Sequence, residues 1–164
     1  MIIKSDRIQF TLTIPEDLDA VLAMEQDDYN SQFVFSWTRQ QHLDTIENPS
    51  CLHLAIRDAE DLLGYMILSG IGSRDRAIEF KRMVIGPKGK GYGRESVRLL
   101  KKLAFEVLGC HRLWLDVFDD NAPAISLYYD EGFVKEGLLR DCKWSPQGFR
   151  SMLVMSMLEY EYKK

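Results

Sequence analysis

Four glycines separate a predicted strand from a predicted helix in the stretch Val84-Ile85-Gly86-Pro87-Lys88-Gly89-Lys90-Gly91-Tyr92-Gly93-Arg94. Residues 76–85 before them are rich in apolar and β-branched side chains, and a helical pattern follows. Glycine lets the backbone approach a ligand, and a helix N-terminus offers unpaired N–H donors at the positive end of its dipole. The stretch therefore predicts a pyrophosphate site. The plainer interpretation is a tight connection between strand and helix.

Positive charge is concentrated around this stretch. The 164 residues contain 21 Lys and Arg against 25 Asp and Glu, a net charge of −4. Residues 81–102 alone carry +7, and the other residues sum to −11. The basic cluster by itself would also fit an RNA-binding protein. The negative net charge of the whole chain and the spacing of the glycines argue against nucleic acid as a partner.

Several other classes of protein are excluded by simple features. No apolar run approaches the roughly 20 residues that cross a bilayer, and the N-terminus lacks the order of a signal peptide. We therefore expect a cytoplasmic protein without a membrane partner. Cys51, Cys110 and Cys142 are too few and too widely spaced for a disulfide framework or a zinc site. We expect reduced thiols and no metal.

The pattern along the chain predicts one mixed α/β domain over residues 1–164. Strands are expected over residues 7–14, 51–57, 62–69, 76–85, 112–118, 133–140 and 150–160. Helices are expected over residues 15–25, 36–48, 91–108 and 121–131, and a hairpin turn over residues 143–148. Short links between the strands from residue 51 to residue 85 indicate an antiparallel meander.

Two common phosphate-binding motifs fail at named positions of the glycine stretch. A P-loop read from Gly86 requires Lys and then Ser or Thr after Gly91, where Tyr92 and Gly93 stand. A dinucleotide fingerprint read from Gly89 requires glycine where Arg94 stands. Another kind of anion site is therefore indicated.

Two motifs, in this order, resemble those of the GNAT superfamily of N-acetyltransferases. Residues 88–93 resemble its acetyl-CoA signature (Q/R)-x-x-G-x-(G/A), with Lys88 where Gln or Arg is usual. Residues 121–133 resemble its motif N-x-x-A-x-x-L-Y-x-x-x-G-F. Residues 136–140 and the closing hairpin resemble the branch of ribosomal-protein N-terminal acetyltransferases, of the RimJ and RimL type, which includes polyamine acetyltransferases.

The resemblance implies a mostly antiparallel GNAT-like sheet flanked by helices. Its parallel central strands, residues 76–85 and 112–118, would splay apart around acetyl-CoA. The pantetheine arm would pair with backbone of Met83, Val84 and Ile85. Asn121 would bond the same arm, with simple helix capping as the alternative. The residues implied for the pyrophosphate are Lys88, Gly89, Lys90, Gly91, Tyr92, Gly93 and Arg94.

The resemblance also implies an acetyl transfer in which an amine attacks the thioester directly. Tyr128 would donate a proton to the departing thiolate, a role in which we rank Tyr129 well below it. Both tyrosines could instead be packing aromatics. Glu79 would accept the amine proton, and strand alternation places it on the face of Met83 and Ile85 unless a bulge intervenes. The alternatives are water as the base and a solvated Glu79 paired with Lys81 or Arg82.

The acceptor is expected to be a small-molecule or peptide amine. The acidic residues 16–28 could attract it, with Glu25, Asp27, Asp28 and Tyr29 as candidates, although the earliest acids also suit a helix dipole. The histidines form no visible cluster in the sequence. A CoA-binding regulatory module without turnover is the alternative function. The edge of the C-terminal hairpin could support a homodimer.

Overall fold

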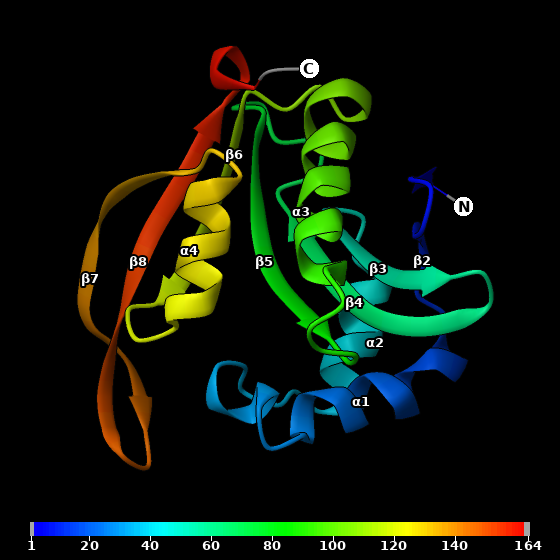
Figure 1. The fold of residues 1–164 in the computed structure, drawn as a ribbon, viewed down its shortest axis with the longest axis horizontal. Helices are drawn as coiled ribbons and strands as arrows, with labels where there is room; N and C mark the ends of the chain where they lie inside the picture. Colours follow the sequence, from blue (N-terminus) through cyan, green and yellow to red (C-terminus); the bar gives the residue numbers. More distant parts are fainter. Residues whose placement is uncertain (1, 163–164) are drawn as a thin grey trace.

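One mixed sheet of eight strands, in the order β1-β2-β3-β4-β5-β6-β8-β7, organises the protein (Figure 1). The structure is a computed structural model that describes residues 2–162, so the ends of the predicted domain, residues 1 and 163–164, lie outside the described residues. The strands are β1 (Ile3–Lys4), β2 (Gln9–Leu12), β3 (Cys51–Asp58), β4 (Asp61–Ser69), β5 (Ala77–Ile85), β6 (Arg112–Phe118), β7 (Val134–Ser145) and β8 (Gly148–Leu158).

The helices follow the sequence pattern closely. The α-helices are α1 (Leu18–Gln26), α2 (Arg39–Glu47), α3 (Tyr92–Lys102) and α4 (Ala122–Asp130). Shorter turns are η1 (Pro15–Asp17), η2 (Asn30–Gln32) and η4 (Glu159–Glu161), and the π-helical turn η3 (Leu103–Val107) continues α3. None of the helices within residues 2–162 is long and apolar enough to cross a membrane.

The sheet is antiparallel except at its centre, where β5 and β6 run parallel. Their pairing covers only Ala77–Glu79 against Arg112–Trp114. Beyond this short ladder the two strands diverge, and Figure 1 shows the opening widening toward the bottom of the view. The predicted fold class, an α/β domain with splayed central strands, is confirmed.

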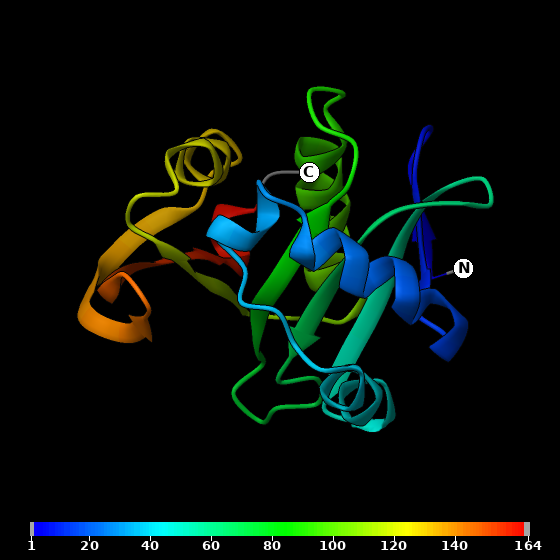
Figure 2. The ribbon, with the colours of Figure 1, turned by 90° about the horizontal axis from the view of Figure 1, so that it is seen from below.

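Helices cover both faces of the sheet. Figure 2 shows α3 and α4 on the side opposite α2. On the α3 side, apolar residues at helical spacing such as Val97, Leu100 and Leu103 are fully buried against the strands. On the other side, Leu18 and Val21 of α1 pack on a smaller cluster, whose sheet members are Tyr65, Ile67 and Val84.

The C-terminal hairpin differs from the sequence prediction. Strand β7 continues to Ser145, so the hairpin turn predicted within residues 143–148 is present but confined to residues 146–147. Lys143 and Trp144 pair with Arg150 and Phe149 in the ladder. Backbone pairing with β8 extends a strand whose exposed polar side chains carry no hydrophobic alternation.

Candidate active site

A cavity of about 500 Å³ lies where β5 and β6 separate. This volume is typical of a small-molecule site. Among the predicted site residues, those that line it are Glu79, Met83, Ile85, Lys88, Gly89, Gly91, Tyr92, Gly93, Asn121 and Tyr128. Val84, Lys90 and Arg94 are not lining residues of this cavity. The Val84 side chain packs instead under α1.

The edge of β5 that faces the cavity offers free backbone groups. Pairing with β6 ends at Glu79, and residues 80–85 have no strand partner on this side among the described residues. Unpaired N–H and C=O groups at a sheet edge bind an extended, amide-bearing ligand as an added strand does. Met83 to Ile85 thus lie where a pantetheine arm could pair.

The glycine stretch forms a turn that approaches the cavity with bare backbone. Gly89 and Gly91 have φ of +72° and +79°, a left-handed conformation that favours glycine. Gly91 is the N-cap residue of α3, so the first turn of that helix directs its N–H groups at the space beyond the loop. Backbone donors with the positive helix end make this a site that suits a pyrophosphate.

Two of the three cations of the stretch, Lys88 and Arg94, are held by protein partners, and the third, Lys90, is exposed. Lys88 Nζ donates to Asn30 Oδ1 at 2.6 Å and to the Ile85 carbonyl at 2.5 Å, and burial lowers its pKa. Arg94 bonds Asp130 at 2.9 Å and Glu131 at 3.0 Å. The Lys88 contacts connect the loop to η2, and the Arg94 contacts connect α3 to the end of α4. The anion site is therefore built chiefly from the backbone.

Tyr128 projects from α4 toward the cavity. Its ring packs edge-on against Phe80 and Phe133, with centroids 5.9 and 5.8 Å away. Burial raises the pKa of Tyr128, so its hydroxyl keeps its proton at neutral pH. Within residues 2–162 the Tyr128 hydroxyl has no hydrogen-bond partner. Tyr129, in contrast to Tyr128, does not line the cavity and its side chain is 48% exposed. Asn121 Oδ1 accepts from the Ala124 N–H at 3.4 Å and so caps α4.

A β-bulge changes the predicted direction of Glu79. The register with β4 shifts between Phe80 and Arg82, which leaves Lys81 as the extra residue. Glu79 therefore lies on the α1 and α2 side of β5 and does not share a face with Met83 and Ile85, which is the exception that the sequence prediction allowed for a bulge. Its carboxylate accepts from the Ser69 hydroxyl at 2.9 Å and still lines the cavity.

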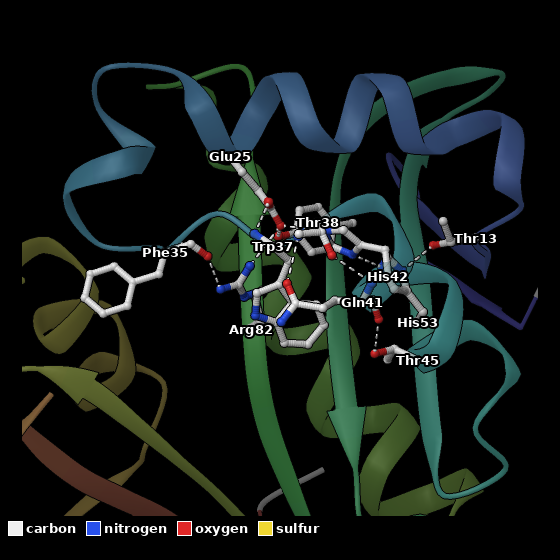
Figure 3. A network of polar contacts seen from close by, with 11 residues as sticks. Thr13, Glu25, Phe35, Trp37, Thr38, Gln41, His42, Thr45, His53 and Arg82 are labelled. Atoms are coloured by element: carbon white, nitrogen blue, oxygen red, sulfur yellow. Dashed lines mark hydrogen bonds and ion pairs between the residues drawn. The ribbon is translucent and has the colours of Figure 1, made fainter. Parts of the chain in front are cut away.

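A buried carboxylate, Glu25, holds two residues that line the cavity, Arg82 and Trp37. Glu25 is fully buried, and its oxygens accept from Arg82 at 2.9 Å and from the Trp37 N–H at 3.0 Å (Figure 3). The Tyr65 hydroxyl donates to the same carboxylate. Burial alone would raise the pKa of Glu25, but hydrogen bonds from His42, Tyr65 and the Trp37 backbone outweigh it and hold that pKa below its usual value. Arg82 also donates to the Phe35 carbonyl.

Two histidines extend this network across the sheet, a cluster that the sequence analysis missed. His42 Nε2 lies 2.8 Å from Glu25 Oε1, and His42 Nδ1 lies 2.9 Å from His53 Nε2. His53 Nδ1 lies 2.8 Å from the Thr13 hydroxyl. The three distances fit one proton order, in which Thr13 donates to His53, His53 to His42, and His42 to Glu25. No local spacing reveals this cluster, because three elements and the loop after β2 supply its residues.

The acidic stretch is largely used within the protein. Glu25 is enclosed, Asp17 pairs with Arg57 at 2.6 Å, and Asp27 accepts from the backbone N–H groups that open η2. The expectation that Glu25 and Asp27 attract a cationic acceptor is therefore corrected. All three cysteines are free, and the described residues contain no group of side chains that could hold a metal ion.

A family model described as acetyltransferase (GNAT) family matches residues 18–133, more than half of the chain. The chain belongs to this family. Both motifs of the sequence analysis fall inside or at the end of the matched range. The match also includes α1, whose sequence carries neither motif.

The relatives include spermidine acetyltransferases and uncharacterized N-acetyltransferases. The chain is 30% identical over 110 residues to spermidine N(1)-acetyltransferase of Vibrio cholerae, which is 65% of this chain and 63% of that protein. It is 35% identical over 74 residues to uncharacterized N-acetyltransferase p20 of Bacillus licheniformis, 45% of this chain and 42% of that protein. The chain thus spans less than two thirds of these relatives. They do not support the ribosomal-protein branch that residues 136–140 suggested.

Solved structures share the fold over nearly the whole chain. The spermidine N-acetyltransferase of V. cholerae in complex with CoA and spermine has a TM-score of 0.86, with 21% identity, and covers 96% of this chain and 99% of that one. A dodecameric structure of the V. cholerae enzyme has a TM-score of 0.81 with 22% identity. At these identities the likeness shows the fold alone.

Proposed function

We propose that the protein is an N-acetyltransferase that uses acetyl-CoA as co-substrate and acetylates a primary amine. The observation that carries the proposal is the joining, in one cavity, of a free β5 edge, a glycine turn at the N-terminus of α3, and the unpaired hydroxyl of Tyr128. The first two fit a pantetheine arm and a pyrophosphate. Membership of the acetyltransferase family supports the same conclusion.

The proposed reaction is a direct transfer. The amine nitrogen forms a bond to the acetyl carbonyl carbon, and the carbon–sulfur bond of the thioester breaks. Tyr128 gives its proton to the departing sulfur, because its raised pKa keeps the hydroxyl protonated until charge develops there. The amine loses a proton to Glu79, directly or through water. The Ser69 hydroxyl orients the Glu79 carboxylate by donating to it at 2.9 Å. The chain itself forms no covalent intermediate.

The test is turnover with a defined set of amines. We expect saturating acetyl-CoA to raise the melting temperature, because it binds the folded state, and amines to release free CoA. A protein that binds acetyl-CoA but releases no CoA with any amine would instead be a CoA-binding regulatory module. If acetyl-CoA does not change the melting temperature, both functions are refuted. The free cysteines fit a reducing compartment, and we place the protein in the cytoplasm.

A homodimer through the C-terminal hairpin is part of the proposal. Strand β7 is the edge of the sheet, and the hairpin exposes large apolar side chains, with Trp144 68% and Phe149 65% exposed. The V. cholerae relative is described as dodecameric. Sedimentation of the purified chain should show a dimer that Trp144→Ser weakens. The matched variant Tyr160→Ser, at another exposed aromatic, should leave it unchanged.

A further inference from the structure

The end of the cavity away from the glycine turn is walled by aromatic rings. The segment between η2 and α2 supplies Phe35 and Trp37, and β6 supplies Phe118. Phe35 and Phe118 lie 5.6 Å apart between ring centroids across the opening of the sheet. Arg150 of β8 donates to the Gln32 carbonyl at 3.0 Å, which holds the hairpin against this wall. An acceptor entering here meets a largely apolar surface.

Aromatic faces commonly bind ammonium groups, but here the protein's own cations already lie over them. Arg82 lies 4.5 Å from the Trp37 ring centre. Lys88 lies 4.8 Å from the Tyr29 ring centre. Arg150 lies 3.6 Å from the ring centre of Phe118. A substrate cation would have to displace these groups to reach Trp37, Tyr29 or Phe118, so these three rings are not free to bind a second ammonium.

Among the described residues that line the cavity, two of the three charges without a polar partner are positive, and the third is Asp116. Lys81 and Lys143 line the cavity and have no hydrogen-bond or ion-pair partner among residues 2–162. Lys81 is the exposed bulge residue, and its Nζ lies 5.8 Å from the Trp37 ring centre. The carboxylates among the described lining residues are Glu79, to which we assign the amine proton, and Asp116. A chain of several ammonium groups finds no matching row of acids.

We infer that the acceptor is a monoamine with an apolar or aromatic body and an anionic group, which Lys81 and Lys143 bind. This inference rests on the proposed function and narrows it away from the polyamines in the relatives' names. A lysine ammonium binds carboxylate and phosphate alike as a point charge. The bulge adds Lys81 to β5 two residues beyond Glu79, so one strand supplies both the proton acceptor and the anion site.

The inference is tested with phenethylamines that share the reacting amine and differ only in the para group. The purified chain is assayed by release of CoA with a carboxylate, a carboxamide and a trimethylammonium substituent, and with spermidine. We expect kcat/KM for the carboxylate to exceed that for the carboxamide about tenfold, the size of one charge-assisted contact. The trimethylammonium compound and spermidine should be poorest. Tyramine phosphate distinguishes a phosphate-bearing acceptor from a carboxylate-bearing one.

Charge reversal at Lys81 provides the decisive comparison. Lys81→Glu should invert the order of carboxylate and trimethylammonium substrates, and Lys143→Gln should reduce the preference. The control Lys135→Glu changes an exposed lysine of β7 outside the cavity and should leave the order intact. A preference for spermidine, or an order unaffected by Lys81→Glu, would overturn the inference. Absence of CoA release with every amine would instead refute the proposed function.

Discussion

Arg82 donates to the fully buried carboxylate of Glu25 across 2.9 Å. The same guanidinium holds the Phe35 carbonyl and lies over Trp37. One ion pair inside the protein therefore positions the segment that forms the aromatic wall of the cavity. A buried pair of this kind contributes to geometry more than to stability, whereas the loss of one partner leaves an uncompensated charge.

Replacement of Arg82 should affect the acceptor end and spare the cofactor end. We expect Arg82→Ala to lower the free energy of unfolding by about 3–5 kcal/mol, because Glu25 loses its cation. It should raise the acceptor KM while the Kd for acetyl-CoA stays unchanged. Denaturant unfolding and calorimetric titration measure the two effects. Arg140→Ala, at an exposed arginine, is the control. An intact acceptor KM would contradict the positioning role.

Tyr128→Phe removes the proton donor and keeps the ring packed on Phe80 and Phe133. We expect kcat to fall about 10²-fold, because the thiolate then leaves without a proton. The Kd for acetyl-CoA should stay within about twofold of that of the parent chain, because the substitution leaves the packing of the ring unchanged. Tyr129→Phe is the matched control on the same helix. Unchanged turnover in Tyr128→Phe would show that this tyrosine is only a packing residue.

Glu79→Gln separates a carboxylate base from bulk water. If Glu79 accepts the amine proton, kcat should fall about tenfold or more at neutral pH, and the deficit should shrink at higher pH, where more of the amine is already neutral. The pH profile of kcat is the measurement. Glu60→Gln, in the exposed β3–β4 turn, serves as control. Superimposable profiles for the variant and the parent chain would assign the proton to water.

Gly91→Ala tests the backbone cradle. Its φ of +79° strains any residue with a Cβ, at about 1–2 kcal/mol, although the nearest atom to an added Cβ is Arg7 Nη1 at 3.8 Å. We expect a roughly tenfold weaker Kd for acetyl-CoA, because relief of this strain would turn the N–H groups. Gly72→Ala carries the same strain, with φ +76°, and Gly72 is not a lining residue of the cavity. Equal cofactor affinity in both variants would count against the cradle.

The buried histidines should make the fold sensitive to acid. Burial and the neighbouring His42 lower the pKa of His53 from 6.5 to about 4, so the folded protein keeps this ring neutral. The unfolded chain binds the proton first, so the stabilisation is complete above pH 6.5 and is lost as pH falls toward 4. The loss amounts to about 3 kcal/mol.

Variants at two histidines can test this dependence of stability on pH. The measurement is the free energy of unfolding by denaturant at several pH values. His53→Gln should be less stable at pH 7 and should show a flatter dependence between pH 6.5 and pH 4. His111→Gln, at a half-exposed histidine, should retain the slope of the parent chain. A steep slope in His53→Gln would place the acid sensitivity elsewhere, with Glu25 as the next candidate.

The features near the glycine stretch could be predicted because they depend on neighbours in the sequence. Left-handed backbone at Gly89 and Gly91 follows from the absence of a Cβ, and α3 follows from its helical period. The meander of β3, β4 and β5 follows from short links. The spacing of Asn121 and Tyr128 along one predicted helix matched the second motif. These local signals were sufficient for the fold class and the family.

Only the tertiary structure decided the acceptor end. The bulge at Lys81 depends on how β5 pairs with β4, and it turns Glu79 to the opposite face. Glu25, His42 and His53 meet because α1, α2 and β3 pack together, and such contacts leave no period in the sequence. A local pattern reports backbone conformation and the face of one element. Which charges face one another, and which remain free for a substrate, depends on packing between elements distant in the chain.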